Sequence, residues 1–325
     1  MTLDRRRFAA CAAFAILGLA CTAHAQGWPD KPIKFVVPYT PGGGTDAMTR
    51  HLADTVSRDT RWNFVVDNRP GAGGNIGLDQ VAKSVPDGYT IGMGQTSNLA
   101  INPAAMAHVP FDAGKDLVPV ALVAEVPMLL VVRADAPWKS LAELVKAAKA
   151  KSGGLNQALA GTGTVGHLAG VMLARKAGFQ VADVPYKGAA PALTDLLGGQ
   201  TDYMFATPQA VLGMLQAGKL RALGVTSAKR VDAFAGMPTV AEQGYPGFLA
   251  VDWKVVVAPA ATPADVVQRL NAAIGKALTQ PTLVAKLADE ASTPLRGTPQ
   301  EAAKYVRSEQ AKWAAVIREA SIHLD

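Results

Sequence analysis

Apolar and polar positions alternate in blocks from residue 33 onward, and the first block predicts a strand followed by a helix. The run IKFVV at 33–37 is typical of a short buried strand. The turn PYTP separates it from three consecutive glycines at 42–44. Apolar residues then recur at every fourth position, as on one face of a helix: Met48, Leu52 and Val56. The pattern therefore predicts a strand, a glycine-rich loop and a helix whose N-cap is Thr45 or Asp46.

The same alternation repeats twice before residue 100. A predicted strand at 64–66 ends in the glycine-rich loop NRPGAGGN at 68–75, and a helix follows. A predicted strand at 89–93 ends in a small polar loop at 94–98. Strands that alternate with helices indicate a parallel sheet. Because ligands of such sheets bind beyond the carboxyl ends of the strands, we expect the three loops to share one edge.

The rest of the chain predicts a second lobe and a return to the first. Two apolar runs, 118–124 and 128–132, indicate a strand that leaves the first lobe. The alternation then resumes, with helices expected at 141–150, 167–177, 191–197 and 209–217 and strands at 155–160, 181–185, 202–205 and 220–225. A return strand at 252–258 precedes three helices that start at prolines, 263–278, 281–289 and 299–320. We therefore expect an α/β fold of two lobes joined by crossing strands around a ligand cleft, with residues 26–124 and 250–325 in one lobe and 125–249 in the other.

The glycine-rich loops favour the binding of a small anion. Adjacent glycines leave backbone N–H groups uncovered by side chains, and the helix dipole adds about half a positive charge at a helix N-terminus. Gly43 and Gly44 are expected either to have positive φ or to approach a ligand closely. Asp46 is expected to act mainly as a helix cap worth about 1 kcal/mol, because its charge would repel an anion.

Residues 1–25 have the features of a cleaved secretory signal peptide. Arginines at 5–7 precede an apolar stretch at 8–20, and Ala23-His24-Ala25 fits a small-residue cleavage site. The arginines also resemble a twin-arginine motif, so export by either the Sec or the Tat route is expected. Cleavage after Ala25 would remove both cysteines of the chain, Cys11 and Cys21, and with them any disulfide or thiol chemistry.

Charge and hydropathy narrow the class of protein. Removal of the signal takes three Arg and one Asp from 32 basic and 26 acidic residues, which leaves a net charge of +4. The excess of positive charge is spread along the chain without a basic run, so it gives little support to nucleic-acid binding. It is consistent with a protein that attracts small anions. No later segment has the ~20 consecutive apolar residues that a membrane span needs, so a soluble mature protein is expected.

One motif suggests a different class of protein, an exported enzyme. Residues 161–166, GTGTVG, match G-x-G-x-x-G after a predicted strand, and Asp183 lies about twenty residues further on, as in dinucleotide-binding folds. However, Asp183 lies inside a predicted strand, and a pyrophosphate site rarely needs the two threonines of the motif. A second anion-binding loop across the cleft is the favoured interpretation, and a nicotinamide-dependent oxidoreductase is the alternative.

Other catalytic and metal-binding patterns are absent from the sequence. It has no G-x-S-x-G elbow, no P-loop lysine and no histidines at metal-binding spacing, so we expect no enzyme activity, no cofactor and no metal site. Three side chains leave alternatives open. His167 either lines the cleft or caps a helix, and Lys187 either offers charge to the ligand or is solvated. Trp253 is expected to pack in the core or the hinge.

Eight motifs, in this order, resemble those of a known family. They are VVPYTPGGGTD (36–46), NRPGAGGNIG (68–77), PDGYT (86–90), INP (101–103), HLAG (167–170), VPYKGAAPALTDLLGGQTD (184–202), LRALGVTSAKR (220–230) and PTVAEQGYPGF (238–248). Together they resemble the Bug-type extracytoplasmic solute receptors of tripartite tricarboxylate transporters. The resemblance extends over nearly all of the chain after the signal peptide.

The resemblance implies a periplasmic binding protein-like fold (type II) whose lobes close on a small carboxylate and deliver it to membrane transporter subunits. It implies a periplasmic location and no cofactor, and we expect a monomer. In the family, loops matching 39–46 and 73–77 hold the ligand, and loops matching 96–97 and 162–164 add contacts. The ligand-binding residues expected here are Tyr39, Thr40, Gly43, Gly44, Thr45, Asp46, Gly74, Asn75, Ile76, Thr96, Ser97, Thr162, Gly163, Thr164, Tyr186 and Thr207.

Two departures from the family pattern bear on the ligand. Ala206 and Thr207 follow Phe205 where the family often has Asp and Asn, so no acidic partner for a ligand ammonium is expected. After Trp253 the usual aromatic-glycine pair is replaced by Lys254-Val255, which adds a positive charge. Both changes favour plain mono- or dicarboxylates over amino acids. Tyr39 and the small Ala206 leave room for an apolar or aromatic body, so aromatic acids are included. Citrate is disfavoured because no arginine is placed among the loops.

Overall fold

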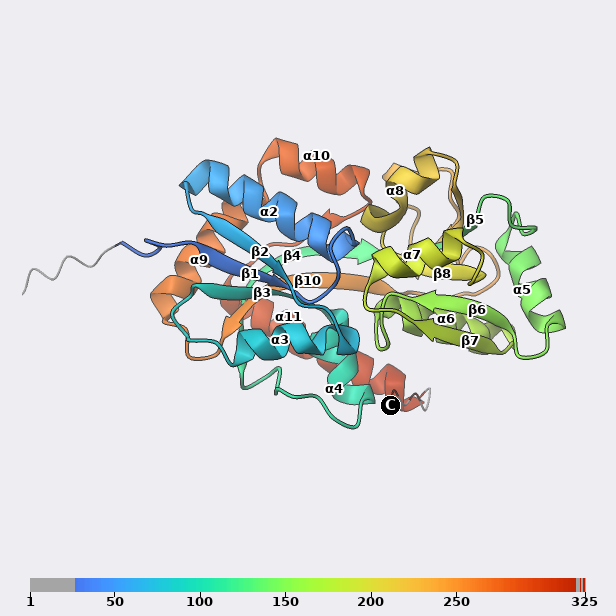
Figure 1. Ribbon diagram of the computed structural model, residues 1–325, viewed down its shortest axis with the longest axis horizontal. Coiled ribbons are helices and arrows are strands. Elements are labelled where there is room, and N and C mark those ends of the chain that lie inside the picture. The colour runs from blue at the N-terminus through green and yellow to red at the C-terminus, as the bar shows by residue number, and fades with distance from the viewer. Residues whose placement is uncertain (1–26, 320–321, 323, 325) are drawn as a thin grey trace, which may run out of the picture. The chain divides into compact units, whose positions relative to one another are not determined.

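The computed structural model of the chain describes residues 27–319, 322 and 324, and the predicted signal peptide at 1–25 lies outside them. The chain divides into two compact units, Met1–Lys31 and Pro32–Asp325. The described part of the first unit, residues 27–31, contains no helix or strand. All elements named below belong to the second unit, whose ribbon is shown in Figure 1.

The first sheet has six strands in the order β11-β4-β10-β3-β1-β2. Their bounds are β1 Ile33–Val37, β2 Phe64–Asn68, β3 Thr90–Gln95, β4 Leu117–Pro127, β10 Val251–Pro259 and β11 Thr293–Pro294. β1 pairs in parallel with β2 and β3, but β10 is antiparallel to both β3 and β4. The parallel pairing predicted for the first three strands is therefore confirmed. The crossing strand β10 is antiparallel to its neighbours, because β4 leaves this lobe and β10 returns to it.

The second sheet has five strands in the order β7-β6-β8-β5-β9. Its strands are β5 Leu129–Arg133, β6 Leu155–Leu159, β7 Val181–Pro185, β8 Tyr203–Ala206 and β9 Leu220–Val225. β6 is parallel to β7 and β8, whereas β5 is antiparallel to β8 and β9. Only Met128 separates β4 from β5, so the chain passes directly from one sheet to the other.

Helices cover these sheets, close to where the apolar periodicity predicts them (Figure 1). They are α2 Gly44–Thr60, α3 Asn75–Ala82, α4 Asn102–Ala105, α5 Leu141–Ala150, α6 Val165–Ala177, α7 Ala189–Leu197, α8 Pro208–Gln216, α9 Ala264–Ala277, α10 Pro281–Asp289 and α11 Pro299–Glu319. The polar loop predicted at 94–98 is wrong. Its first residues end β3, and a π-helical turn, Ser97–Ile101, leads directly into α4.

Strand β8 shows why the second lobe has such apolar strands. Tyr203 and Phe205 belong to the cluster that includes residues of α6, and Met204 and Ala206 belong to the one that includes residues of α7. Successive side chains of a strand point to opposite faces, so both faces of β8 are covered. A strand buried on both faces has a continuous apolar run instead of an alternating one.

Helix α11 packs on the strands that join the two lobes. Trp253 of β10 is buried, its ring lies 5.7 Å from that of Tyr305, and its Nε1 donates to Glu309 Oε2 at 3.0 Å. The Tyr305 hydroxyl donates to Glu125 of β4 at 2.8 Å. The prediction that Trp253 packs in the core or hinge is confirmed.

The start of α2 differs from the predicted one. The helix begins at Gly44 with Gly43 as N-cap, so neither Thr45 nor Asp46 is the N-cap. Asp46, in the first turn, accepts from the backbone N–H of Gly42 at 3.0 Å and from Arg50 Nε and Asn68 Nδ2. The predicted cap role of Asp46 is therefore wrong, and the carboxylate instead fixes the glycine loop to the first turn of the helix.

Replacing Asp46 by asparagine is expected to lower the free energy of unfolding by about 1 kcal/mol at pH 7, because the neutral amide loses the charge-assisted hydrogen bonds of the carboxylate. Burial by itself would raise the pKa of Asp46, but the bonds from Arg50, Gly42 and Asn68 outweigh it and hold the pKa below its ordinary value. A lowered folded-state pKa stabilises the protein above the unfolded-state pKa, and the contribution is lost as the pH falls through the folded-state value. Urea unfolding of both proteins should therefore show a difference that shrinks below pH 4. An equal difference at pH 3 and pH 7 would contradict this role.

Candidate functional site

Two adjoining cavities lie between the lobes. The inner one has a volume of about 50 Å³ and is lined from the first lobe by Tyr39, Gly43, Gly44, Thr45, Gln95 and Asp252 and from the second by Ala160, Thr164, Val165, Gly166, Ala189, Met204, Phe205, Ala206 and Thr207. The outer one, of about 1040 Å³, shares Tyr39 and Ala160 with it. The two cavities therefore adjoin at Tyr39 and Ala160 and together form the candidate site.

Four helix N-termini meet at the inner cavity. Gly43 and Gly44 begin α2, Thr164 and Val165 begin α6, and Ala189 and Thr207 stand at the starts of α7 and α8. The first N–H groups of a helix have no acceptor within the helix, and each N-terminus carries about half a positive charge. No lysine or arginine is among the residues that line this cavity. The inner cavity is therefore suited to an anionic group held by backbone N–H groups.

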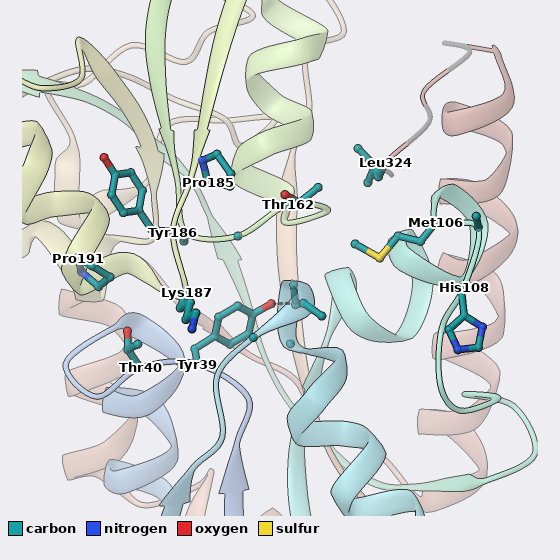
Figure 2. A pocket seen from close by; sticks show the side chains of 17 residues that line it. Tyr39, Thr40, Met106, His108, Thr162, Pro185, Tyr186, Lys187, Pro191 and Leu324 are labelled. Atoms are coloured by element: carbon teal, nitrogen blue, oxygen red, sulfur yellow. Dashed lines mark hydrogen bonds between the residues drawn. The ribbon is translucent and has the colours of Figure 1, made fainter.

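The outer cavity is much wider, and apolar side chains line two sides of it. Figure 2 shows Met106 and Leu324 on one side of it and Pro185, Tyr186 and Pro191 on the other. The loop of Gly71 to Gly74 forms a further part of the wall, and Lys187 and His108 also line it. The prediction left open whether Lys187 faces the cleft, and the exposed lysine lies at the wall of this outer part.

The lobes touch through glycines. A Cβ atom at Gly44 would clash with Thr207 Oγ1, and one at Gly188 would clash with Thr40 Oγ1. Neither Gly43 nor Gly44 has positive φ; Gly43 has φ −85°, and the positive value of 80° belongs to Gly42. Of the two predicted alternatives for Gly43 and Gly44, positive φ is therefore excluded, and close approach to a ligand stays a prediction. Gly44 instead leaves room for a side chain of the opposite lobe.

A chain of buried hydrogen bonds supports the first-lobe wall. The Tyr39 hydroxyl donates to the Gly73 carbonyl at 2.8 Å and lies 2.7 Å from Ser97 Oγ. Burial raises the pKa of Tyr39 far above its ordinary value, so it remains a neutral phenol. Gln95 Nε2 donates to Ser97 Oγ at 3.1 Å, and Thr45 Oγ1 donates to Gln95 Oε1 at 2.7 Å. The network holds the tyrosine in place between the two cavities.

The predicted ligand-binding residues divide into two groups. Ten line one or both cavities, namely Tyr39, Gly43, Gly44, Thr45, Thr164 and Thr207 in the inner one and Tyr39, Thr40, Gly74, Thr162 and Tyr186 in the outer one. The Tyr186 hydroxyl donates to Asp195 at 2.6 Å, and burial together with this carboxylate raises the pKa of Tyr186 to about 12. Tyr186 therefore presents a neutral aromatic ring to the cleft.

Six predicted residues line neither cavity: Asp46, Asn75, Ile76, Thr96, Ser97 and Gly163. Most of them have structural partners behind the walls. Asn75 Oδ1 accepts from Asn102 at 2.8 Å, and Thr96 Oγ1 accepts from the backbone N–H of Trp253 at 2.9 Å. The Ile76 residue is 53% exposed. In the sequence, these supporting residues stand next to wall residues in the same small polar loops. The sequence alone therefore could not distinguish the two kinds of position.

Sequence reasoning missed Gln95 and Asp252 as wall residues. Gln95 falls in the predicted polar loop, and Asp252 is the first residue of the predicted return strand. The sequence predicted these segments but gave no sign that either side chain would line the cleft. The side chains meet because β10 pairs with β3, with Lys254 opposite Gln95. Asp252 also places an acidic group at the cavity, which the prediction from Ala206 did not foresee.

The G-x-G-x-x-G loop has its own side-chain partners. The Gly163 N–H donates to His167 Nδ1 at 3.2 Å, so the proton of this imidazole is on Nε2, which lies 3.1 Å from Asp183 Oδ2. Thr164 caps α6, since its hydroxyl accepts from the His167 N–H. The acidic residue that a dinucleotide site needs is thus paired with a histidine of the same loop region. This arrangement disfavours the oxidoreductase alternative.

Two other features are absent from the described residues, a metal-binding cluster and a membrane-spanning helix. Across 27–319, 322 and 324, no group of three or more His, Cys, Asp or Glu side chains could hold a metal ion. No helix within the same residues is long and apolar enough to cross a membrane.

Comparison with known proteins identifies the family. The family described as "Tripartite tricarboxylate transporter family receptor" matches residues 48–322. The chain belongs to this receptor family. The solved structure of the periplasmic binding protein BugD is similar to this receptor, with 33% sequence identity, a TM-score of 0.87 and coverage of 91% of this chain and 99% of its own. The two α/β lobes and the Bug-type resemblance predicted from the sequence are thereby confirmed, and this receptor is a periplasmic solute-binding protein.

Two further solved structures similar to this receptor contain named ligands. Rpa4515 of R. palustris, solved with adipate, is 36% identical, with a TM-score of 0.88 and coverage of 91% of this chain and 99% of its own. MatC of Rhodopseudomonas palustris, solved with bound malate, is 32% identical, with a TM-score of 0.82 and coverage of 89% and 100%.

Proposed function

We propose that this receptor captures a small carboxylic acid between its lobes and delivers it to the membrane subunits of a tripartite transporter. The convergence of four helix N-termini on the inner cavity carries the proposal. Their N–H groups can hold a carboxylate where no basic side chain lines the wall. The adipate and malate of the two related structures are carboxylates as well, which supports the same ligand class.

The sizes of the cavities suggest how such an acid is placed. The inner cavity of about 50 Å³ is far smaller than the outer one of about 1040 Å³, so it suits the carboxylate group of a ligand and not its body. The body of the ligand then extends past Tyr39 into the outer cavity, where Met106, Pro191 and Leu324 offer apolar surface. Acids of four to six carbons and aromatic acids fit this arrangement, whereas citrate brings more charge than the cleft can balance.

The proposal also covers the mode of action of the receptor, its oligomeric state, its location and the boundaries of its lobes. The receptor acts by binding and is not an enzyme, functions as a monomer, and reaches the periplasm after cleavage of the segment 1–25. Its lobes comprise residues 26–124 with 250–325 and residues 125–249. The two sheets support this division, since β1 to β4, β10 and β11 form one of them and β5 to β9 the other.

A thermal-shift screen with the mature protein should identify the ligand class. Mono- and dicarboxylates of four to six carbons and aromatic acids are expected to raise the melting temperature, and citrate is not. A ligand at a hundred times its Kd adds about 2.7 kcal/mol to the free energy of unfolding, which such a screen detects readily. Titration calorimetry of the best acid should then give one site per chain. No response to any carboxylate would contradict the proposal.

The oxidoreductase alternative predicts a bound dinucleotide, which the receptor proposal does not. Native mass spectrometry and the ultraviolet spectrum of the purified protein should show no retained dinucleotide. A bound species with adenine or nicotinamide absorption, lost when Gly163 is replaced, would favour the enzyme over the receptor.

A further inference from the structure

A buried ion pair lies at the inner cavity. Lys254 Nζ donates to Asp252 Oδ2 at 2.6 Å, and the two side chains are 0% and 3% exposed. Trp253, between them in β10, points to α11, so Asp252 and Lys254 point to the opposite face of the sheet. Lys254 Nζ also donates to Gln95 Oε1 at 3.1 Å. Gln95 and Asp252 both line the inner cavity, which places the pair at its wall.

One oxygen of this pair is left without a partner. Asp252 Oδ1 is buried and has no hydrogen-bond partner among the described residues. The neighbouring acceptor, Gln95 Oε1, already receives bonds from Thr45 and Lys254. A buried acceptor that stays unpaired is costly, and a charged one more so. Asp252 Oδ1 is therefore an unsatisfied acceptor on a residue of this wall, and a donor on a bound molecule would relieve it.

The charge of the surroundings decides which donor fits. Lys254 already neutralises Asp252, and four helix N-termini add positive potential to the same cavity. A ligand ammonium would bring another positive charge into this field. A hydroxyl group donates a hydrogen bond without adding charge, and its oxygen can in turn accept from a helix N–H group.

We propose that Asp252, held by Lys254, accepts a hydrogen bond from a hydroxyl group of the ligand, so that the receptor selects hydroxycarboxylic acids. The proposal rests on the carboxylate-receptor function above and names the ligand class within it. The carboxylate of the ligand faces the helix N-termini, and a hydroxyl on the neighbouring carbon faces Asp252. Lys254 is a positioning residue, since its Nζ fixes the orientation of the Asp252 carboxylate and it does not line the cavity itself.

Calorimetric titration of the mature protein with matched acids tests the proposal. On a five-carbon skeleton the probes are glutarate, each enantiomer of 2-hydroxyglutarate, 2-oxoglutarate and glutamate; on a four-carbon skeleton they are succinate, each enantiomer of malate, and aspartate. One hydroxy acid enantiomer is expected to bind about 10- to 100-fold more tightly than the unsubstituted acid of the same length. The oxo acid, which has no donor, should bind like the unsubstituted one.

The variant Asp252→Asn should remove this preference, because the amide can turn its NH₂ group to the ligand and then favours an acceptor such as the oxo group. Asp54→Asn removes an equal charge from an exposed position of α2 and should keep the wild-type ranking. Thermal melts of both variants report whether they fold, and the wild-type series needs no variant at all.

Three possible results of the titrations would each contradict a different part of the proposal. An unsubstituted acid that binds as tightly as its hydroxy derivative would overturn the role of Asp252 and leave the receptor function intact. Glutamate or aspartate as the tightest probe would overturn the hydroxyl in favour of an ammonium. If no acid of either series binds and the broader carboxylate screen is negative too, the proposed function fails and this inference with it.

Discussion

Replacing Gly44 by alanine is expected to weaken ligand binding about 10- to 100-fold while leaving the fold intact. The new Cβ would overlap Thr207 Oγ1 of the opposite lobe and lie 3.1 Å from Thr207 Cβ and 3.3 Å from Gln209 Oε1. Overpacking of this kind costs about 1–3 kcal/mol. Because the overlap exists only when the lobes meet, the cost falls on the closed arrangement, and the apparent affinity drops with the population of that arrangement.

Gly43→Ala is the matched control for this change. A Cβ at Gly43 would lie 3.6 Å from Ala189 Cβ, an ordinary contact, and Gly43 has an extended backbone that alanine can adopt. We expect its Kd to stay within about threefold of the wild-type value. Equal losses at Gly43 and Gly44 would contradict an effect through lobe closure.

A double-mutant cycle separates closure from direct contact with the ligand. Thr207→Ala removes the Oγ1 atom that the new Cβ would meet, so Gly44→Ala should cost much less affinity in that background. Small-angle scattering should show that saturating ligand compacts the wild type and the double variant alike. If the two losses simply add, the clash with Thr207 is not the cause.

Replacing Lys254 by methionine is expected to lower the free energy of unfolding by about 3–5 kcal/mol. The lysine side chain is fully buried, and without it Asp252 keeps a buried charge that no described basic group neutralises. Methionine preserves most of the volume, so the loss reflects the uncompensated carboxylate and not a cavity. Chemical denaturation at pH 7 measures it.

Two comparisons sharpen this prediction. The double variant Asp252→Asn/Lys254→Met removes both charges and should recover a large part of the loss. Lys115→Met removes an exposed member of a surface pair, whose side chain is 83% exposed, and should change stability by less than about 1 kcal/mol. A loss below 1 kcal/mol in Lys254→Met itself would show that the pair contributes little to the fold.

Local patterns in the sequence determined most of the elements of this receptor. Apolar periodicity placed the strands and helices, because a strand or helix must bury one face whatever it packs against. The glycines after β1 and the loop at 161–166 predicted two anion-binding helix N-termini, and the structure adds those of α7 and α8 at the same cavity. The order of the loop motifs indicated the family before any tertiary contact was known.

Contacts between distant residues decided the rest. β10 runs antiparallel to β3 and brings Lys254 to Gln95, which lies 159 positions away in the chain. No local pattern distinguishes a lysine that will be fully buried beside an aspartate from one that will be solvated. The same holds for the pairing of His167 with Asp183 and of Gly44 with Thr207. Sequence alone determined which segments form strands, helices and glycine loops, because those depend on neighbours along the chain. The tertiary structure alone decided which side chains meet across the cleft, because strand register and lobe packing set the distances between them.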